Sequence, residues 1–183
     1  MAKAKGKAQA HTPPLIYVDT CVFLDMLFTR TKPHPATGEP RWKSAKALFE
    51  AIYDGRVHLA TSALVETELG CFADVRDGGS EIHDKVRSYL DAPPPSTLYV
   101  EVDRSLARDA VRLSRMLHQQ DPEAKQLKSL DAVHMAAAVR LHANYLMTQD
   151  GAFPIGHTVE GVDVRWTEIV WPAGLWDESV ASA

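Results

Sequence analysis

Two aspartates follow short apolar runs of the sequence, at positions where a parallel sheet would bring them together. Asp19 follows residues 15–18, and Asp150 follows the run around residues 145–147. Ligands bind at the carboxyl ends of parallel strands, so both carboxylates are expected near one edge of the sheet. Such a pair suits a hard divalent cation, although each aspartate alone is equally well explained as a helix cap or turn residue.

A third carboxylate, Glu68, falls on the apolar face of an expected helix that begins after Ser62. The apolar arc of that helix consists of Leu64, Val65, Leu69 and Phe72. At about 100° per residue, Glu68 lies inside this arc, whereas Glu66 points to its far side. A buried carboxylate is costly unless it meets a metal, a cation or a set of donors, and a salt bridge from a neighbouring helix is the alternative to a metal.

Asp131 poses the same problem in the first turn of a helix, 130–139, that is apolar almost all round. It shares an arc with Leu130, Met135 and Ala138. A helix N-terminus stabilises a carboxylate by a few tenths to about 1 kcal/mol, which is less than the cost of burying it without partners. A cation from outside the chain would resolve the problem.

The elements that must position these acids alternate between strand-like and helical patterns. Strands are expected at 15–18, 57–61, 98–102, 145–147 and 162–166. Helices are expected up to residue 27, at 42–53, after a Ser62 cap to 73, at 80–91, after an Asp103 cap to 118, and after a Ser129 cap to 142. The alternation predicts an α/β fold of three layers, α/β/α, with a central, mainly parallel sheet of four to five strands.

The domain organisation predicted from composition is simple, because 183 residues suffice for one domain with a proper core. We expect a basic disordered tail at 1–13, one domain at 14–170 and a C-terminal extension at 171–183. The tail lacks the apolar segment of a signal peptide, and the apolar stretch at 15–28 is too short to span a membrane. Residues 29–41 contain three prolines and a glycine, which indicates a loop.

The charge balance excludes one class of nucleic-acid-binding protein. Twenty basic residues against 24 acidic ones give a net charge of −4, which does not fit a protein that holds nucleic acid by bulk positive charge. The two cysteines, Cys21 and Cys71, are too few for a disulfide framework and lack the spacing of a zinc site, so a reducing cytoplasm is the expected compartment.

The four acid-bearing segments are residues 16–20, 62–69, 130–136 and 147–150. Their order and spacing resemble those of PIN-domain nucleases, especially the VapC-like toxins of bacterial toxin–antitoxin pairs, over about residues 14–155. The resemblance implies a parallel sheet whose acidic quartet binds divalent metal and cleaves RNA. Carried over position by position, the quartet is Asp19, Glu68, Asp131 and Asp150, with Thr20 and Thr148 as accessory residues.

The chemistry implied is metal-dependent hydrolysis of a phosphodiester bond. Two Mg²⁺ or Mn²⁺ ions about 4 Å apart activate a water and stabilise both oxygens of the displacement. We expect Asp19 and Asp150 to hold the principal metal, with Asp131 bridging or bound through water. Glu68 would serve the second metal or orient the attacking water, and the products would carry 5′-phosphate and 3′-hydroxyl ends.

Other candidate residues have competing explanations. Arg104, Arg108, Arg112 and Arg115 lie within about 80° of one another on one helix face, opposite an apolar side expected to pack on the sheet. This stripe would track RNA phosphates, or else form a solvated face with ion pairs to Glu101, Asp109 or a neighbouring helix. His134 is better explained as a hydrogen-bonded core histidine than as a metal ligand, and Cys21 as a buried thiol.

The function predicted from the sequence is therefore an endoribonuclease, acting as the toxin of a toxin–antitoxin pair. Its expected partners are an RNA substrate, a cognate antitoxin and a second copy of the chain, with no membrane. The alternatives are a PIN-like module that binds RNA or protein without cutting, a housekeeping RNA-processing nuclease, and a phosphatase with an aspartyl nucleophile. Without the quartet, 20 acidic residues would balance 20 basic ones, so the charge of −4 does not exclude nucleic acid as a substrate.

Overall fold

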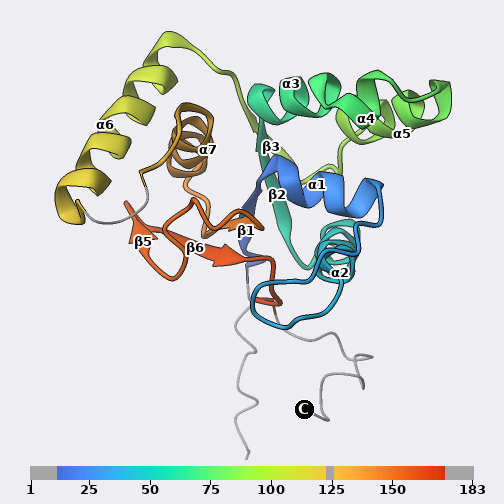
Figure 1. The fold of residues 1–183 in the computed structure, drawn as a ribbon, viewed down its shortest axis with the longest axis horizontal. Coiled ribbons are helices and arrows are strands. Elements are labelled where there is room, and N and C mark those ends of the chain that lie inside the picture. The colour runs from blue at the N-terminus through green and yellow to red at the C-terminus, as the bar shows by residue number, and fades with distance from the viewer. Residues whose placement is uncertain (1–11, 123–125, 172–183) are drawn as a thin grey trace, which may run out of the picture.

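Strand β1 lies inside a six-stranded sheet that forms the centre of the molecule (Figure 1). The computed structural model describes residues 12–122 and 126–171. The strand order is β3-β2-β1-β4-β6-β5, and every pair is parallel except β5 with β6. The strands are β1 Leu15–Val18, β2 His58–Ser62, β3 Leu98–Val100, β4 Tyr145–Thr148, β5 Thr158–Val159 and β6 Val162–Trp166.

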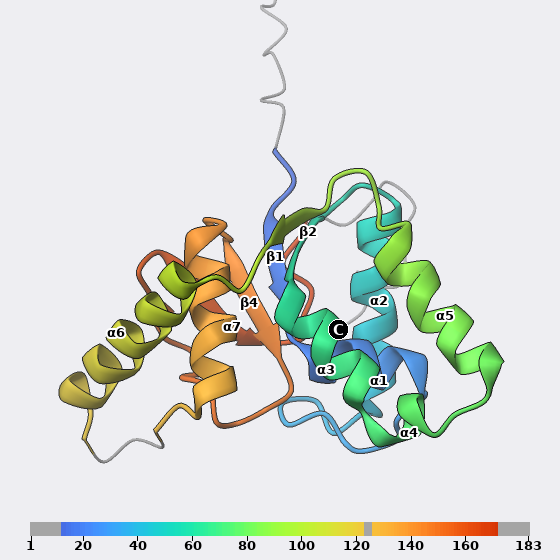
Figure 2. The ribbon, with the colours of Figure 1, turned by 90° about the horizontal axis from the view of Figure 1, so that it is seen from above.

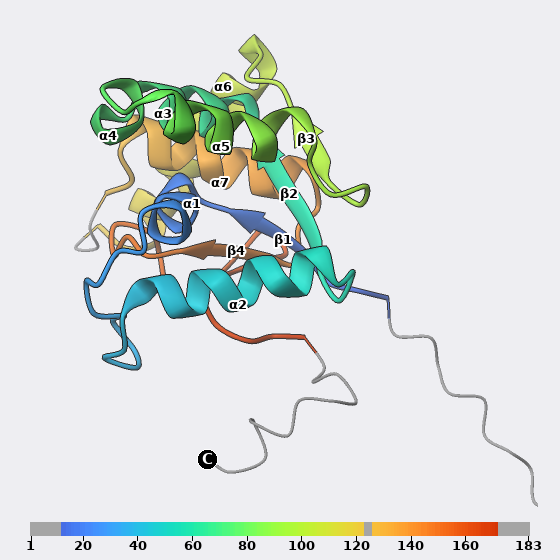
Figure 3. The same cartoon turned by 90° about the vertical axis from the view of Figure 1, so that its right-hand side faces the viewer.

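Helices cover both sides of the central strands. They are α1 Thr20–Leu27, α2 Arg41–Tyr53, α3 Ala63–Cys71, α4 Ala73–Arg76, α5 Ser80–Asp91, α6 Arg104–Gln120 and α7 Ser129–Arg140. Helix α7 packs on β1, β2 and β4, and α6 packs on α7, whereas α2 lies on the other side of the sheet (Figure 3). Helix α3 contacts α1, and α4 and α5 continue from it (Figure 2). This arrangement confirms the predicted α/β/α layers.

The two central strands are continuous apolar runs because helices cover both of their faces. Tyr17 and Val18 of β1 and Leu146 and Met147 of β4 are completely buried. The register pairs Val18 with Met147, and the backbone N–H of Asp19 donates to the carbonyl of Met147 at 3.0 Å. The carboxyl ends of β1 and β4 therefore lie side by side, as predicted for Asp19 and Asp150.

The structure differs from the predicted elements in several details. The sheet has six strands, because the two-residue β5 pairs with β6 and is too short to leave a periodic pattern. The helix after Ser62 ends at Cys71, where Phe72 is extended, and the short α4 follows. Helix α6 packs on α7 rather than on the sheet.

Of the three predicted helix N-caps, one forms a side-chain cap bond. Asp103 caps α6 as predicted, accepting from the N–H of Leu106 at 2.6 Å. Ser62 occupies the N-cap position of α3, but its hydroxyl contacts the Tyr17 hydroxyl at 2.7 Å and makes no cap bond. The N-cap of α7 is Lys128, so Ser129 is the first helical residue and not the predicted cap.

The predicted ends of the domain remain predictions, because few of their residues are described. The expected tail at 1–13 and extension at 171–183 lie almost entirely outside the described residues. Trp171, the last described residue, is 6% exposed and packs on the core. No helix in the described part of the chain is long and apolar enough to cross a membrane.

Candidate active site

Asp19 is a buried carboxylate held in place from one side. It lies at the N-cap position of α1, and its side chain makes no cap bond. Its Oδ2 accepts from the hydroxyl of Thr148 at 2.6 Å and from the thiol of Cys21 at 2.9 Å. Its Oδ1 lies 3.6 Å from Nε2 of His134. The end of β4 thus fixes one carboxylate oxygen, and the other faces α7.

The carboxylate of Glu68 reaches the same place from α3. It is half-buried, and its Oε2 accepts from the Thr20 hydroxyl at 2.5 Å and from His134 Nε2 at 2.9 Å. Burial raises the pKa of Glu68, but these hydrogen bonds and the charge of His134 outweigh burial, so the net shift is downward. Glu66, in contrast, is exposed and accepts from the Tyr99 hydroxyl.

His134 connects these acids to a buried chain of hydroxyls. The imidazole is 2% exposed, and its Nδ1 lies 2.9 Å from the Tyr17 hydroxyl, which in turn lies 2.7 Å from Ser62 Oγ. Burial lowers the pKa of His134, but the hydrogen bond to Glu68 and the nearby carboxylates outweigh it and raise the pKa. His134 is thus a core histidine with both nitrogens hydrogen bonded, as expected, but its partner is a site carboxylate.

Asp131 is half-buried in the first turn of α7. Its Oδ2 accepts from the backbone N–H of Lys128 at 3.3 Å. Burial raises the pKa of Asp131, and the charges of Asp150 and Asp19 raise it further, beyond what the Lys128 bond offsets. Asp131 is therefore close enough to both aspartates for mutual repulsion. Leu130, expected to be buried beside it, is 49% exposed, because this end of α7 extends past the packed core.

Asp150 is exposed and lies two residues after the end of β4. Its Oδ1 accepts from the N–H of Ala152 at 2.8 Å, and its own N–H donates to the Thr148 hydroxyl at 2.9 Å. Thr148 therefore bonds to Asp19 through its hydrogen and to Asp150 through its oxygen. One hydroxyl fixes the spacing between the two strand-end aspartates.

The structure brings the four acids to one edge of the sheet, but not all of them lie equally close to one another. Asp19, Glu68 and His134 each offer a ligand atom, and these atoms lie within 4.8 Å of one another. Asp131 and Asp150 are coupled to this cluster through their charges. Sequence reasoning missed His134 as a member, although its spacing of three from Asp131 places both on one helix face.

The donor set fits a hard divalent cation. Carboxylate oxygens are the preferred ligands of Mg²⁺ and Mn²⁺, and the repulsion that raises the pKa of Asp131 is relieved when a cation binds. The residues that would hold a metal are the carboxylates of Asp19 before α1, Glu68 on α3, Asp131 on α7 and Asp150 after β4.

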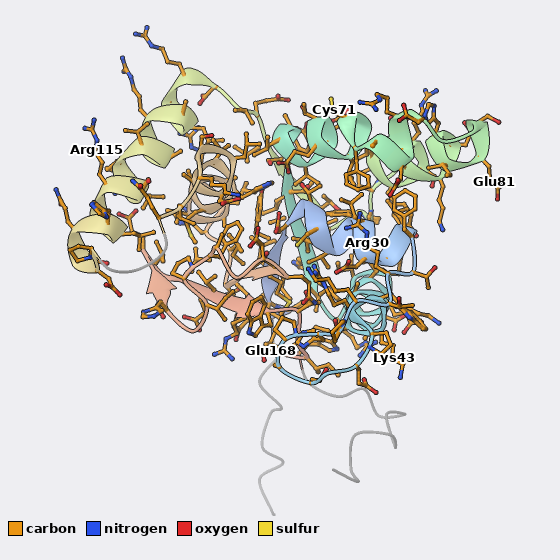
Figure 4. The ribbon with its side chains drawn as sticks, in the orientation of Figure 1. Arg30, Lys43, Cys71, Glu81, Arg115 and Glu168 are labelled. Carbon is orange, nitrogen blue, oxygen red and sulfur yellow. The ribbon has the colours of Figure 1, made fainter. Side chains whose placement is uncertain are left out.

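The arginine stripe lies away from this cluster, on the outer face of α6. All four guanidinium-bearing residues are exposed, and Figure 4 shows Arg115 pointing away from the molecule. Arg112 forms a two-nitrogen pair with the carboxylate of Glu160, between β5 and β6, and not with the expected Glu101 or Asp109. Asp109 instead pairs with Arg140 of α7 at 2.6 Å.

Comparison with known proteins agrees with this architecture. The family model described as PIN domain matches residues 16–155. No curated protein matches the sequence significantly. Solved structures are similar in fold. VapC20 of Mycobacterium tuberculosis, a sarcin-ricin loop cleaving toxin, has a TM-score of 0.54 and 19% identity over 79% of this chain and 97% of that one.

Two toxin–antitoxin structures are similar as well. VapBC2 of Rickettsia felis, bound to a DNA fragment from its promoter, has a TM-score of 0.52 and 16% identity over 82% of this chain and 97% of that one. FitAcB of Neisseria gonorrhoeae has a TM-score of 0.52 and 17% identity, over 83% and 97%. At these identities the likeness is one of fold.

Proposed function

This chain belongs to the PIN domain family, and on that premise we propose that it is a metal-dependent endoribonuclease that hydrolyses RNA phosphodiester bonds. The observation that carries the proposal is the gathering of carboxylates from four elements at one edge of the sheet. Asp131 is kept there although burial and two neighbouring aspartates disfavour its charge. Such repulsion is expected where a cation is to be bound.

The roles of the acids follow from how each is held. Asp19, fixed by Thr148 and Cys21, and Asp150, fixed by the same threonine, would hold the principal metal, with Asp131 bridging or bound through water. A bound Mg²⁺ or Mn²⁺ supplies acidified water and neutralises phosphate charge. Glu68, kept ionised by its two donors, would orient the attacking water or serve the second metal.

Two threonines act as accessory residues in this proposal. Thr20 donates to Glu68 and Thr148 donates to Asp19, so each hydroxyl occupies one carboxylate oxygen and would leave the other for a metal. Attack by a metal-activated water would leave 5′-phosphate and 3′-hydroxyl ends. The chain's own contribution is to hold four carboxylates in place and, through Glu68, to orient the attacking water.

The similar structures support a biological setting for this activity. VapC20 is a toxin, and VapBC2 belongs to a toxin–antitoxin pair. We therefore propose that this chain is the toxin of such a pair, with RNA as its substrate, a cognate antitoxin as its partner and a homodimer as its assembly. A PIN-like module that only binds is disfavoured, because it would keep the unfavourable charge of Asp131 without use.

The deciding experiment compares RNA cleavage in EDTA, Mg²⁺ and Mn²⁺. We expect the wild-type protein to cut structured RNA only with metal, and Asp131→Asn and Glu68→Gln to lose at least about a hundredfold in rate. Glu66→Gln is the matched control, since Glu66 lies exposed on the same helix and should leave the rate unchanged. Cutting in EDTA, or equal cutting by Asp131→Asn, would contradict the proposal.

A separate experiment distinguishes a toxin from a housekeeping nuclease. Expression of the wild-type protein in a bacterial host should stop growth, whereas Asp131→Asn should not. An active nuclease whose expression leaves growth unchanged would favour the housekeeping role.

A further inference from the structure

A pocket of about 620 Å³ has walls that include Gly151, the residue that follows Asp150 of the acidic site. It is lined by the last turns of α6, by residues 126–127, by the segment 151–159 after β4, and by Trp166 of β6. In Figure 2 the segment after β4 passes the start of α7 toward α6. The pocket therefore lies between the end of α6 with residues 126–127 on one side and the segment that follows β4 on the other.

Two of the lining segments continue directly into site acids. Gly151 follows Asp150, and the carboxylate of Asp150 accepts from the N–H of Ala152, which lines the pocket. On the other side, residues 126–127 lead into Lys128, whose N–H donates to Asp131. A group seated in the pocket would thus lie beside a phosphate held at Asp131 and Asp150.

The chemistry of the walls suits a nucleobase. Leu117, Phe153, Ile155 and Trp166 provide apolar and aromatic surface. Unstacked RNA bases are recognised by stacking on such side chains and by hydrogen bonds along their edges. Polar groups that could read a base edge come from His118, Gln120, Gln126 and His157.

The lining also argues against a phosphate as the occupant. None of the described residues that line the pocket is Lys or Arg. Phosphate recognition relies on cationic side chains, whereas a neutral base needs none. The dimensions fit as well, because small-molecule sites have volumes of about 300–1,000 Å³ with mainly apolar walls and a few polar groups.

We propose that this pocket binds one base of the RNA next to the cleaved phosphate and so determines the nucleotide preference of cleavage. The inference rests on the proposed ribonuclease function and adds to it a site of base recognition outside the acidic cluster. Gln120 and His118 of α6 would read the base edge, and Trp166 would cover its face.

The first test measures base binding without cleavage. AMP, GMP, CMP and UMP are titrated in EDTA while the indole N–H signals of the four tryptophans are followed by NMR, with Trp166→Phe to assign one of them. We expect at least one nucleotide to shift the Trp166 signal, and ribose 5-phosphate, which lacks a base, not to shift it. No response to any of the four nucleotides, or an equal response to ribose 5-phosphate, would overturn the inference.

The second test maps the cleavage sites of the metal-loaded protein in RNA of random sequence. The wild-type protein should show a base preference at one position next to the cut, and Gln120→Ala should reduce it about fivefold, as expected for one lost hydrogen bond. Gln119→Ala is the matched control, because Gln119 is the adjacent amide and lies on the outer face of α6. It should keep the full preference.

The outcomes separate the inference from the proposed function. If the folded protein cuts no RNA with any metal, the ribonuclease function fails. If it cuts RNA but shows no base preference, or if Gln120→Ala and Gln119→Ala keep the same preference, the function stands and the pocket inference is overturned.

Discussion

The imidazole Nε2 of His134 lies 2.9 Å from Oε2 of Glu68, and this contact joins α7 to α3 inside the acidic site. The opposite nitrogen contacts the Tyr17 hydroxyl of β1, which is bonded to Ser62 at the end of β2. Four elements therefore meet through one histidine. The orientation of Glu68 depends on a chain of hydrogen bonds that begins in the core of the sheet.

Removal of the Tyr17 hydroxyl should disturb Glu68 without touching it. Tyr17→Phe leaves the buried polar atoms of His134 and Ser62 without their partner, which costs about 1–3 kcal/mol in the free energy of unfolding. We expect kcat for RNA cleavage to fall about tenfold and KM to change little. The pH profile of kcat for the variant should be shifted relative to that of the wild-type protein.

Tyr99→Phe is the control for this variant. Its hydroxyl donates to the exposed Glu66, and its loss should change neither urea unfolding nor cleavage. Equal kinetics and pH profiles for Tyr17→Phe and the wild-type protein would show that the hydroxyl chain does not position Glu68.

The His134–Glu68 pair should make the stability of the metal-free protein depend on pH. The pKa of His134 is raised from 6.5, so its contribution is fully present below pH 6.5 and is lost as the pH rises through the folded-state pKa. The pKa of Glu68 is lowered from 4.5, so its contribution is present above pH 4.5 and is lost as the pH falls through the folded-state pKa. The pair therefore stabilises the fold most between pH 4.5 and 6.5.

Urea unfolding between pH 4 and 9 measures this dependence. The wild-type protein should lose stability relative to His134→Gln as the pH rises above 6.5, because the variant has no imidazole to deprotonate. Parallel pH curves for the two proteins would rule out this linkage.

Asp131→Asn should stabilise the metal-free protein while abolishing metal binding. Burial and the charges of Asp150 and Asp19 raise the pKa of Asp131, so the folded state loses stability as the pH rises through the range between the unfolded and folded pKa values. Asparagine removes the charge and keeps an oxygen to accept from Lys128. A gain on the order of 1 kcal/mol is expected, or about 2–4 °C in Tm for a chain of this size.

Thermal unfolding in EDTA and in Mn²⁺ checks both parts of this prediction. Mn²⁺ should raise the Tm of the wild-type protein and leave that of Asp131→Asn unchanged. A lower Tm for the variant in EDTA would mean that Asp131 contributes more to folding than repulsion costs.

The sequence was sufficient for the main fold because the strands that carry it are buried on both faces. Residues 15–18 and 145–147 read as continuous apolar runs, and the rule for strand ends then placed Asp19 and Asp150 together. Strand β5 could not be predicted, since two residues show no periodicity and its pairing depends on the turn at Glu160 and Gly161.

The contacts within the site were less accessible to sequence reasoning than the acids themselves. Helical periodicity separates Glu68 from Glu66, but an imidazole on an apolar helix looks the same whether it meets a backbone carbonyl or a carboxylate. That His134 meets Glu68 depends on how α3 and α7 pack, which local patterns do not encode. Nor do they show that Arg112 pairs with Glu160, 48 residues away.

The outer face of α6 should add salt-dependent affinity for RNA. Arg108 and Arg115 are exposed and, among the described residues, form no ion pair, whereas Arg112 is already paired with Glu160. Each phosphate contact on single-stranded RNA contributes about 0.7 to the salt slope of binding. Fluorescence anisotropy in EDTA should therefore show a smaller slope for Arg108→Ala and Arg115→Ala, and a smaller effect for Arg112→Ala.

Arg87→Ala provides the comparison for α6, because Arg87 is exposed on α5 and pairs with Asp91. It should leave both affinity and salt slope unchanged. If Arg108→Ala and Arg115→Ala behave like Arg87→Ala, α6 presents a solvated face and does not contact RNA.

Breaking the buried pair of Asp25 and Arg41 by removing one partner should destabilise the fold far more than replacing both partners. Asp25 is fully buried, Arg41 donates to its Oδ2 at 2.8 Å, and Oδ1 has no hydrogen-bond partner among the described residues. The pair fixes the end of the proline-rich loop to α1. Arg41→Met leaves a buried charge uncompensated and should cost about 3–5 kcal/mol in urea unfolding.

Two further variants separate the charge from the packing. Asp25→Leu combined with Arg41→Met removes both charges and should recover most of that loss. The attraction within a buried ion pair exceeds the cost of desolvating its two charges by little. Lys43→Met, in the same helix as Arg41, breaks an exposed ion pair with Glu39 of the preceding loop and should cost less than about 0.5 kcal/mol. If Arg41→Met costs no more than Lys43→Met, Asp25 is protonated in the fold and the loop is held by packing alone.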